Sequence, residues 1–135
     1  MPCPGRQSGR EEIGEVVERL RPDRIGHGIL AAGDDELMAM IRDLGITLEI
    51  CPTSNLRIGG ISDPLHHPVH RFIDHGVPFV VASDDPGIFD TTVRDELEWV
   101  AREARLEPGA VEDLVERAWR SRSEVLSGRE AAAKL

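Results

Sequence analysis

The stretch that decides the fold is VPFVVASDDP, residues 77–86. Its first six residues are apolar and rich in valine, and the polar residues Ser83, Asp84 and Asp85 follow at once. A short apolar run of this kind is typical of a strand buried on both faces, as the strands of parallel sheets are. The stretch therefore predicts a parallel β-strand with two carboxylates at its carboxyl end.

Two earlier stretches have the same character. RIGHG, residues 24–28, and ITLEI, residues 46–50, each predict a strand, and the second runs into CPTSN, residues 51–55. Helical spacing of apolar residues lies between these strands and continues after the last one, over residues 13–20, 34–44, 68–76, 93–104, 111–119 and, more weakly, 124–135. Alternating strands and helices predict right-handed βαβ units and a parallel sheet, hence an α/β fold.

The length of the chain limits how much of such a fold it can hold. A closed TIM-type (β/α)8 barrel takes roughly 250 residues, whereas this chain has 135. It could supply about three of the βα units, followed by terminal helices. Residues 1–10 contain Pro, Gly and Ser without periodicity, so we expect an irregular N-terminal segment there and a partial barrel domain over residues 11–135.

Composition excludes several classes of protein. The formal net charge of −9 argues against nucleic acid as a partner, because phosphates would be repelled. No apolar run approaches the roughly 18 residues of a membrane span, and the first residues lack the apolar core of a signal peptide. The two cysteines, Cys3 and Cys51, do not make a disulfide scaffold. We therefore expect a reduced, cytoplasmic protein with no membrane partner.

Polar side chains follow each predicted strand. They are His27 after the first strand, Ser54 after the second, and Asp84 and Asp85 after the third. The carboxyl ends of parallel strands meet at one rim, where active sites lie in barrels and in open sheets. We expect these side chains to converge there. The competing interpretation is that loops after strands are polar anyway, and that Asp85 only caps the next turn.

Taken together, these segments carry a family resemblance. RIGHG, EICPTSN (residues 49–55), His67-Pro68 and SDDP (residues 83–86) resemble the adenosine deaminase family in order and spacing, from about Ile13 to Leu97. The resemblance implies the C-terminal part of a zinc-dependent (β/α)8 barrel. Its implied reaction is the hydrolytic removal of the 6-amino group of adenosine, adenine or a related 6-aminopurine, with release of ammonia.

The resemblance also implies a role for each matched residue. Asp84 resembles the carboxylate zinc ligand, and Asp85 the neighbour that hydrogen-bonds the small-molecule purine substrate. His27 resembles the catalytic histidine that orients and polarises a zinc-bound hydroxide. Zinc lowers the pKa of its bound water towards about 7, which supplies hydroxide at neutral pH.

The family's remaining site residues are absent from this chain. The family takes further zinc ligands from a His-x-His motif and a third histidine, followed by a glutamate that donates a proton. Here histidine occurs only at positions 27, 66, 67, 70 and 75, without those motifs. Zinc sites normally have about four ligands. We therefore expect the isolated chain to lack activity and to need a complementing N-terminal half.

Two alternatives remain open. A non-catalytic truncated remnant could self-associate through the open edges of a three-stranded sheet. A complete small module could instead use Asp84 and Asp85 to bind magnesium. The histidines at 66, 67 and 70 could chelate a metal, but a solvated helix start is the expected interpretation, and we expect Cys51 to be a buried packing residue.

Overall fold

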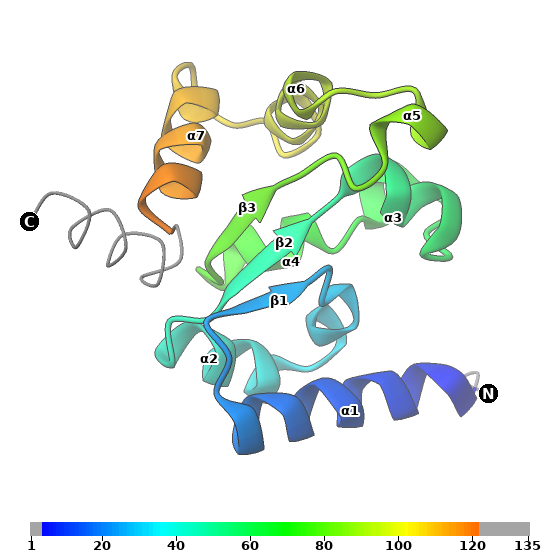
Figure 1. The fold of residues 1–135 in the computed structure, drawn as a ribbon, viewed down its shortest axis with the longest axis vertical. Coiled ribbons are helices and arrows are strands. Elements are labelled where there is room, and N and C mark those ends of the chain that lie inside the picture. The colour runs from blue at the N-terminus through cyan, green and yellow to red at the C-terminus, as the bar shows by residue number, and fades with distance from the viewer. Residues whose placement is uncertain (1–3, 122–135) are drawn as a thin grey trace, which may run out of the picture.

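A three-stranded parallel sheet lies at the centre of the computed structural model, which describes residues 4–121 (Figure 1). The strands lie side by side in the order β1 (Arg24–Gly26), β2 (Thr47–Ile50) and β3 (Phe79–Val81). Leu48 of β2 lies opposite Ile25 on one side and Phe79 on the other. The three predicted strands and their parallel order are therefore confirmed.

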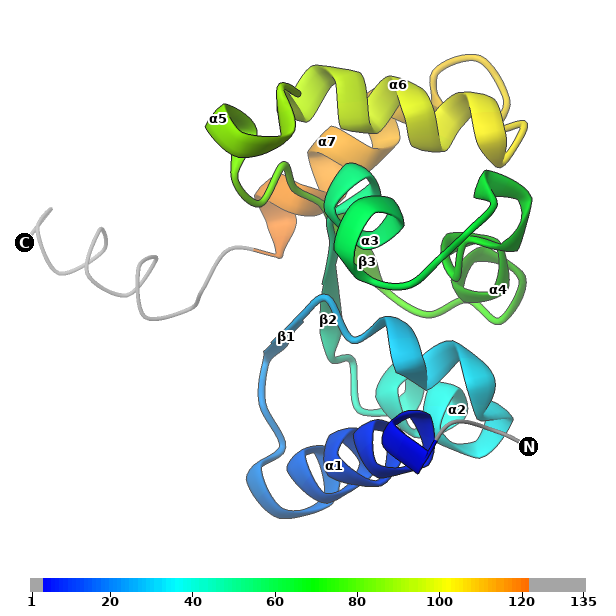
Figure 2. The same cartoon turned by 90° about the vertical axis from the view of Figure 1, so that its right-hand side faces the viewer.

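Helices surround this sheet and connect its strands. In chain order they are α1 (Pro4–Leu20), the 3-10 helix η1 (Ile29–Gly33), α2 (Asp35–Asp43), α3 (Pro52–Ile58), the 3-10 helix η2 (Pro64–His66), α4 (Val69–Asp74), α5 (Pro86–Phe89), α6 (Val93–Glu103) and α7 (Ala110–Arg120). Figures 1 and 2 show α1 and α2 beyond β1, and α6 and α7 beyond β3. All three strands point towards α3 and α5 (Figure 1). The order of elements is that of successive βα units.

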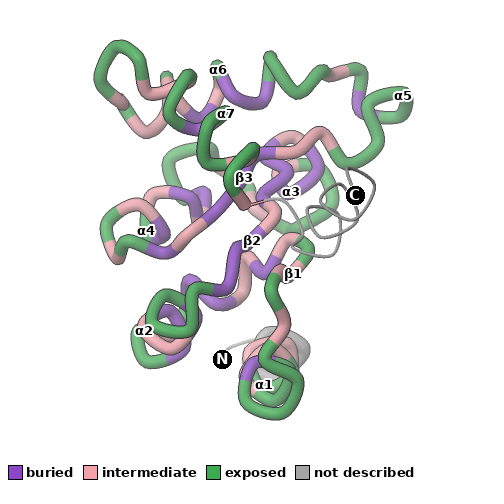
Figure 3. The backbone as a smooth tube through the Cα atoms, turned by 60° about the vertical axis from the view of Figure 1, so that its left-hand side comes forward, coloured by how far each residue is buried: buried purple, intermediate pink, exposed green. Residues whose placement is uncertain are grey.

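The hydrophobic core lies between one face of the sheet and the helices that connect the strands. Alternate residues of a strand point to opposite faces, so Leu48 and Ile50 share one face, and both are fully buried. Buried side chains of α2 and α4 pack in the same cluster, among them Ile41 and Phe72. Figure 3 shows this buried zone along β2, β3 and the inner sides of α2 and α4.

The other face of the sheet carries polar side chains at β1 and β2. Arg24 donates through Nε to Glu49 Oε1 at 2.7 Å, across the two strands. Its Nη1 donates to the backbone oxygen of Ser121 at 2.7 Å, directly after α7. The end of α7 is thus held to the first residue of β1.

Residues 4–10 are helical, so the prediction of an irregular segment over residues 1–10 is wrong for this part. Proline is well accepted at the first position of a helix, and α1 begins at Pro4. A Cβ on Gly9 would come within 2.4 Å of Leu30 Cδ1, so the absent side chain lets α1 approach η1 closely. The helix expected over residues 124–135 lies outside the described residues.

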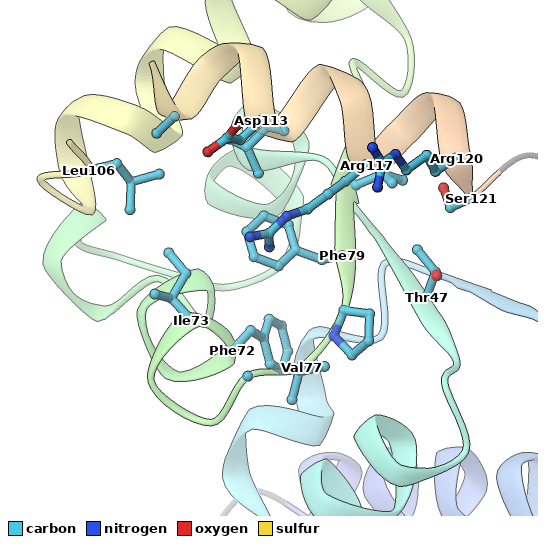
Figure 4. Close-up of a pocket in the computed structure, with 15 residues that line it drawn as sticks. Thr47, Phe72, Ile73, Val77, Phe79, Leu106, Asp113, Arg117, Arg120 and Ser121 are labelled. Atoms are coloured by element: carbon cyan, nitrogen blue, oxygen red, sulfur yellow. The ribbon is translucent and has the colours of Figure 1, made fainter. Parts of the chain in front are cut away.

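An apolar hollow lies away from the carboxyl ends of the strands. It has a volume of about 630 Å³ and is lined by residues of α4, β3 and α7 (Figure 4). Thr47 at the start of β2 and Val77 before β3 line it, together with Leu106 and Arg117. Parallel α/β folds use the opposite end of the strands for chemistry. Among residues 4–121, no helix is both long and apolar enough to traverse a lipid bilayer.

Candidate functional site

Side chains from all three strand ends meet at one rim of the sheet. Ser54 Oγ donates to Asp84 Oδ2 at 2.8 Å, and Asn55 Nδ2 lies 3.0 Å from His27 Nδ1. His27 Nε2 in turn lies 3.7 Å from Asp84 Oδ2. The predicted convergence of His27, Ser54 and Asp84 is therefore observed.

The backbone turns sharply at both strand ends. The His27 N–H donates to Glu49 O at 2.9 Å, and the Ala82 N–H donates to Ile50 O at 2.9 Å, so the sheet ladder continues past the strands. His27 and Asp84 then both adopt a left-handed backbone with φ of 57°. Residues with a Cβ pay about 1–2 kcal/mol for this conformation. The turns project the imidazole and the carboxylate towards each other above the sheet.

The contact with Asn55 favours one tautomer of a neutral His27 ring. With the Asn55 amide nitrogen donating to Nδ1, a neutral His27 ring carries its proton on Nε2, which faces Asp84. The side chains of His27 and Asp84 are 42% and 37% exposed, so both are open to a small molecule. The hollow in front of them, of about 310 Å³, is lined by Gly26, His27, Glu49, Cys51, Val81, Ala82, Ser83, Asp84 and Val93.

Asp85 is placed differently from the other predicted site residues. Its side chain accepts from the Ile88 N–H at 3.4 Å and caps the short helix α5. The residue is exposed. In this arrangement Asp85 has the capping role that was the competing interpretation of the sequence.

Cys51 is the buried packing residue that the sequence predicted. It is a free cysteine with 5% of its surface exposed. Burial raises the pKa of its thiol to about 11, and the nearby carboxylates of Asp84, Glu96 and Glu49 act in the same direction. The thiol is therefore protonated at neutral pH and is a poor nucleophile.

His67 is buried, so the prediction of a solvated helix start is wrong for this residue. It is 1% exposed and contacts Trp99 edge to face, with ring centroids 5.1 Å apart. Its Nδ1 accepts from the Val69 N–H at 3.1 Å, while Nε2 has no hydrogen-bond partner among the described residues. Burial lowers the pKa of His67 to about 4, with a smaller contribution from His70.

Two residues that take part in this region were given no role from the sequence. Asn55 is the last residue of the EICPTSN segment, and its side-chain amide holds His27. Glu96 of α6 is 2% exposed and accepts from the Thr53 N–H at the start of α3. A motif match could have drawn attention to Asn55, whereas a glutamate on a helix gives no sequence signal of burial.

The described residues do not complete a zinc site by themselves. Within residues 4–121, no group of three or more His, Cys, Asp or Glu side chains could hold a metal ion. The cluster offers one carboxylate, Asp84, and one imidazole, His27, where zinc normally takes about four ligands. A metal at this rim would need ligands from beyond the described residues.

Comparison with known proteins decides the family. The model of the adenosine deaminase family matches residues 2–126. The chain belongs to the adenosine deaminase family. Its three βα units are accordingly part of a TIM-type barrel.

The similar proteins are much longer than this chain. It is 48% identical over 99 residues to aminodeoxyfutalosine deaminase of Acidothermus cellulolyticus, covering 73% of this chain and 28% of that protein. It is 40% identical over 97 residues to adenine deaminase of Rhizobium johnstonii, covering 72% of this chain and 30% of that protein. The chain thus spans about a third or less of these relatives.

Solved structures agree with the fold. Adenine deaminase of Arthrobacter aurescens superposes with a TM-score of 0.76 and 26% identity, over 87% of this chain and 36% of that one. Arabidopsis ADAL complexed with IMP superposes with a TM-score of 0.73 and 26% identity, over 93% of this chain and 35% of that one.

Proposed function

We propose that this chain supplies part of the active site of a zinc-dependent purine deaminase that hydrolyses a 6-amino group and releases ammonia. The observation that carries the proposal is the cluster of His27, Ser54, Asn55 and Asp84 at the carboxyl ends of three parallel strands. Support comes from relatives named for deamination and from a similar structure that binds IMP, a purine nucleotide.

Each residue then has a role that its contacts support. Asp84 would be a zinc ligand, with its Oδ2 oriented by the hydroxyl of Ser54. His27, anchored through Nδ1 by Asn55, would present Nε2 to the reacting groups and hold or release a proton there. Asp85 is exposed beside Asp84, and its carboxylate would accept hydrogen bonds from the purine once it leaves its cap on α5.

Zinc would supply a hydroxide at neutral pH when bound. Since the described residues do not complete its coordination, we assign the missing ligands and the proton-donating glutamate to the part of such an enzyme that this chain does not match. The chain alone is then expected neither to retain stoichiometric zinc nor to deaminate adenine or adenosine.

A chimera tests the proposal. The segment of the Acidothermus aminodeoxyfutalosine deaminase that aligns with this chain is replaced by the chain itself, and zinc content and deamination are measured. The proposal expects both to survive in the chimera and to be lost in its Asp84→Asn variant. Glu98→Gln, an exposed change on α6, is the matched control and should leave both unchanged.

Two results would overturn the proposal. One is a chimera that is folded by circular dichroism and monodisperse, yet has no zinc and no turnover. The other is an Asp84→Asn chimera that keeps its zinc and its turnover, because the carboxylate would then not be a ligand.

A second candidate is a non-catalytic protein that self-associates. Within residues 4–121, β1 and β3 each pair only with β2, which leaves the outer edge of each strand without a strand partner. Such edges are templates for pairing with another chain.

A further inference from the structure

We infer that Glu96 is a positioning residue of the candidate site, which fixes the segment after β2 against the segment after β3. The positioning is a property of this chain, and only its consequence for catalysis rests on the proposed function. Glu96 lies on α6 and is only 2% exposed, whereas a glutamate on a surface helix is usually exposed to solvent. A buried carboxylate is tolerated only where donors satisfy its oxygens.

Both oxygens of Glu96 have a donor, and the two donors come from different segments. Oε2 accepts from the Thr53 N–H at 3.0 Å. Oε1 accepts from Thr91 Oγ1 at 2.8 Å. Thr53 is the second residue of α3, which follows β2, and Thr91 lies after α5 in the segment that follows β3. Glu96 therefore joins the two segments that carry the site.

The contact at Thr53 bears directly on the site, because Ser54 and Asn55 are the next two residues. Ser54 holds Asp84, and Asn55 holds His27. A carboxylate that accepts from a backbone N–H makes a stronger bond than a neutral acceptor. Fixing the Thr53 N–H fixes the first turn of α3, and with it the direction of both side chains.

The cap at the start of α6 orients Glu96 towards Thr53 and Thr91. Thr92 Oγ1 accepts from the Asp95 N–H at 3.2 Å, and Asp95 Oδ2 accepts from the Thr92 N–H at 2.8 Å. This reciprocal capping box defines where the helix begins. Glu96 is the next residue, and α6 passes over α3 (Figure 2). The cap thus sets the rotation of α6 that turns Glu96 inwards.

Nuclear magnetic resonance of the full chain tests the inference, with Glu96→Leu compared against Glu96→Gln. Glutamine keeps an oxygen for the Thr53 N–H, and its amide can donate to the Thr91 hydroxyl. Leucine fills the space without any acceptor. The readouts are the Asn55 side-chain amide signals, the His27 ring nitrogen signals and the hydrogen exchange of the Thr53 amide. Glu98→Gln is the control on the exposed side of α6.

In Glu96→Leu, the Asn55 and His27 signals should move and the Thr53 amide should exchange about tenfold faster or more. In Glu96→Gln and in the control they should stay at their original positions. A lower urea midpoint for Glu96→Leu with unmoved Asn55 and His27 signals would overturn the inference, because the role would then be structural only. So would Glu96→Gln signals that move as far as those of Glu96→Leu.

A second variant covers the case in which Glu96→Leu does not fold. Thr91→Val removes only the donor to Oε1, so the same signals should move in the same direction by less; unmoved signals would overturn the inference. None of these measurements needs zinc or turnover. An inactive chimera together with the expected signals would therefore remove the proposed function and leave the role of Glu96 intact.

Discussion

Acidification from pH 7 to pH 5 should destabilise the chain through one buried imidazole. His67 is 1% exposed, and its ring contacts Trp99. Burial holds its pKa at about 4, below the ordinary value of 6.5. The unfolded chain therefore binds a proton at this residue before the folded chain does. Stability that is complete above about pH 6.5 is lost as the pH falls towards 4.

The size of this loss in unfolding free energy follows from the pKa of His67 in the folded and in the unfolded chain. A difference of one pKa unit corresponds to about 1.4 kcal/mol, so a shift from 6.5 to about 4 corresponds to about 3 kcal/mol at low pH. Between pH 7 and pH 5 the loss amounts to about 2 kcal/mol of unfolding free energy, because protonation of the unfolded state is then nearly complete while the folded state remains neutral. The total unfolding free energy of a folded domain is only about 5–15 kcal/mol, so this loss is a large share of it.

Urea denaturation at pH 7 and at pH 5 measures this loss, with His67→Asn as the test variant. The asparagine oxygen can replace Nδ1 as acceptor for the Val69 N–H, but it does not titrate. The difference in unfolding free energy between the two pH values should be smaller in His67→Asn by about 2 kcal/mol. His66→Asn, at a neighbouring imidazole that is 80% exposed, is the control for removal of a histidine from this segment. An equal pH dependence in His67→Asn and the original chain would refute the reasoning.

Three further predictions concern the site and its surroundings. Cys51 should react with iodoacetamide at pH 8 at least about a hundredfold more slowly in the native chain than in urea, because its pKa of about 11 makes the thiolate rare. Peptide mass mapping measures the two rates, and equal rates would contradict this prediction. Thr92→Ala should lower the unfolding free energy by about 1 kcal/mol through loss of the α6 cap, whereas Thr92→Ser should not; urea melts of the two variants decide. The average mass of the chain in light scattering should rise with concentration, because both outer strand edges lack a strand partner within residues 4–121; a constant monomer mass would exclude self-association.

The strands and the rim of the site could be predicted because their signals are local. Short apolar runs mark β2 and β3, and polar residues follow each strand directly. Parallel order then brings His27 and Asp84 together without any knowledge of distances. The roles of zinc and of Asp85 stay predictions, since the described residues do not test them.

Helix α3 was missed for a physical reason. The glycines at 59 and 60 favour a loop, and α3 buries the polar residues Ser54 and Asn55 in place of an apolar stripe. Periodicity arguments detect only helices that bury apolar residues at regular spacing.

The burial of His67 and Glu96 could not be predicted from the sequence either. Both are polar residues on or beside helices, where exposure is the usual expectation. Their environments come from distant partners: Trp99 covers His67, and Thr53 and Thr91 satisfy Glu96. Such partners become known only when the packing of helices is known.

The left-handed turns at His27 and Asp84 have a consequence for how this protein can change. Glycine adopts such a backbone freely, as Gly28 does beside His27, so glycine at either position would relieve strain of about 1 kcal/mol. The same change would remove the hydrogen-bond partner of Asn55 at position 27, or of Ser54 at position 84, and both of these partners are buried. At these two positions the backbone alone favours glycine, whereas the hydrogen bonds of the cluster favour the histidine and the aspartate that stand there.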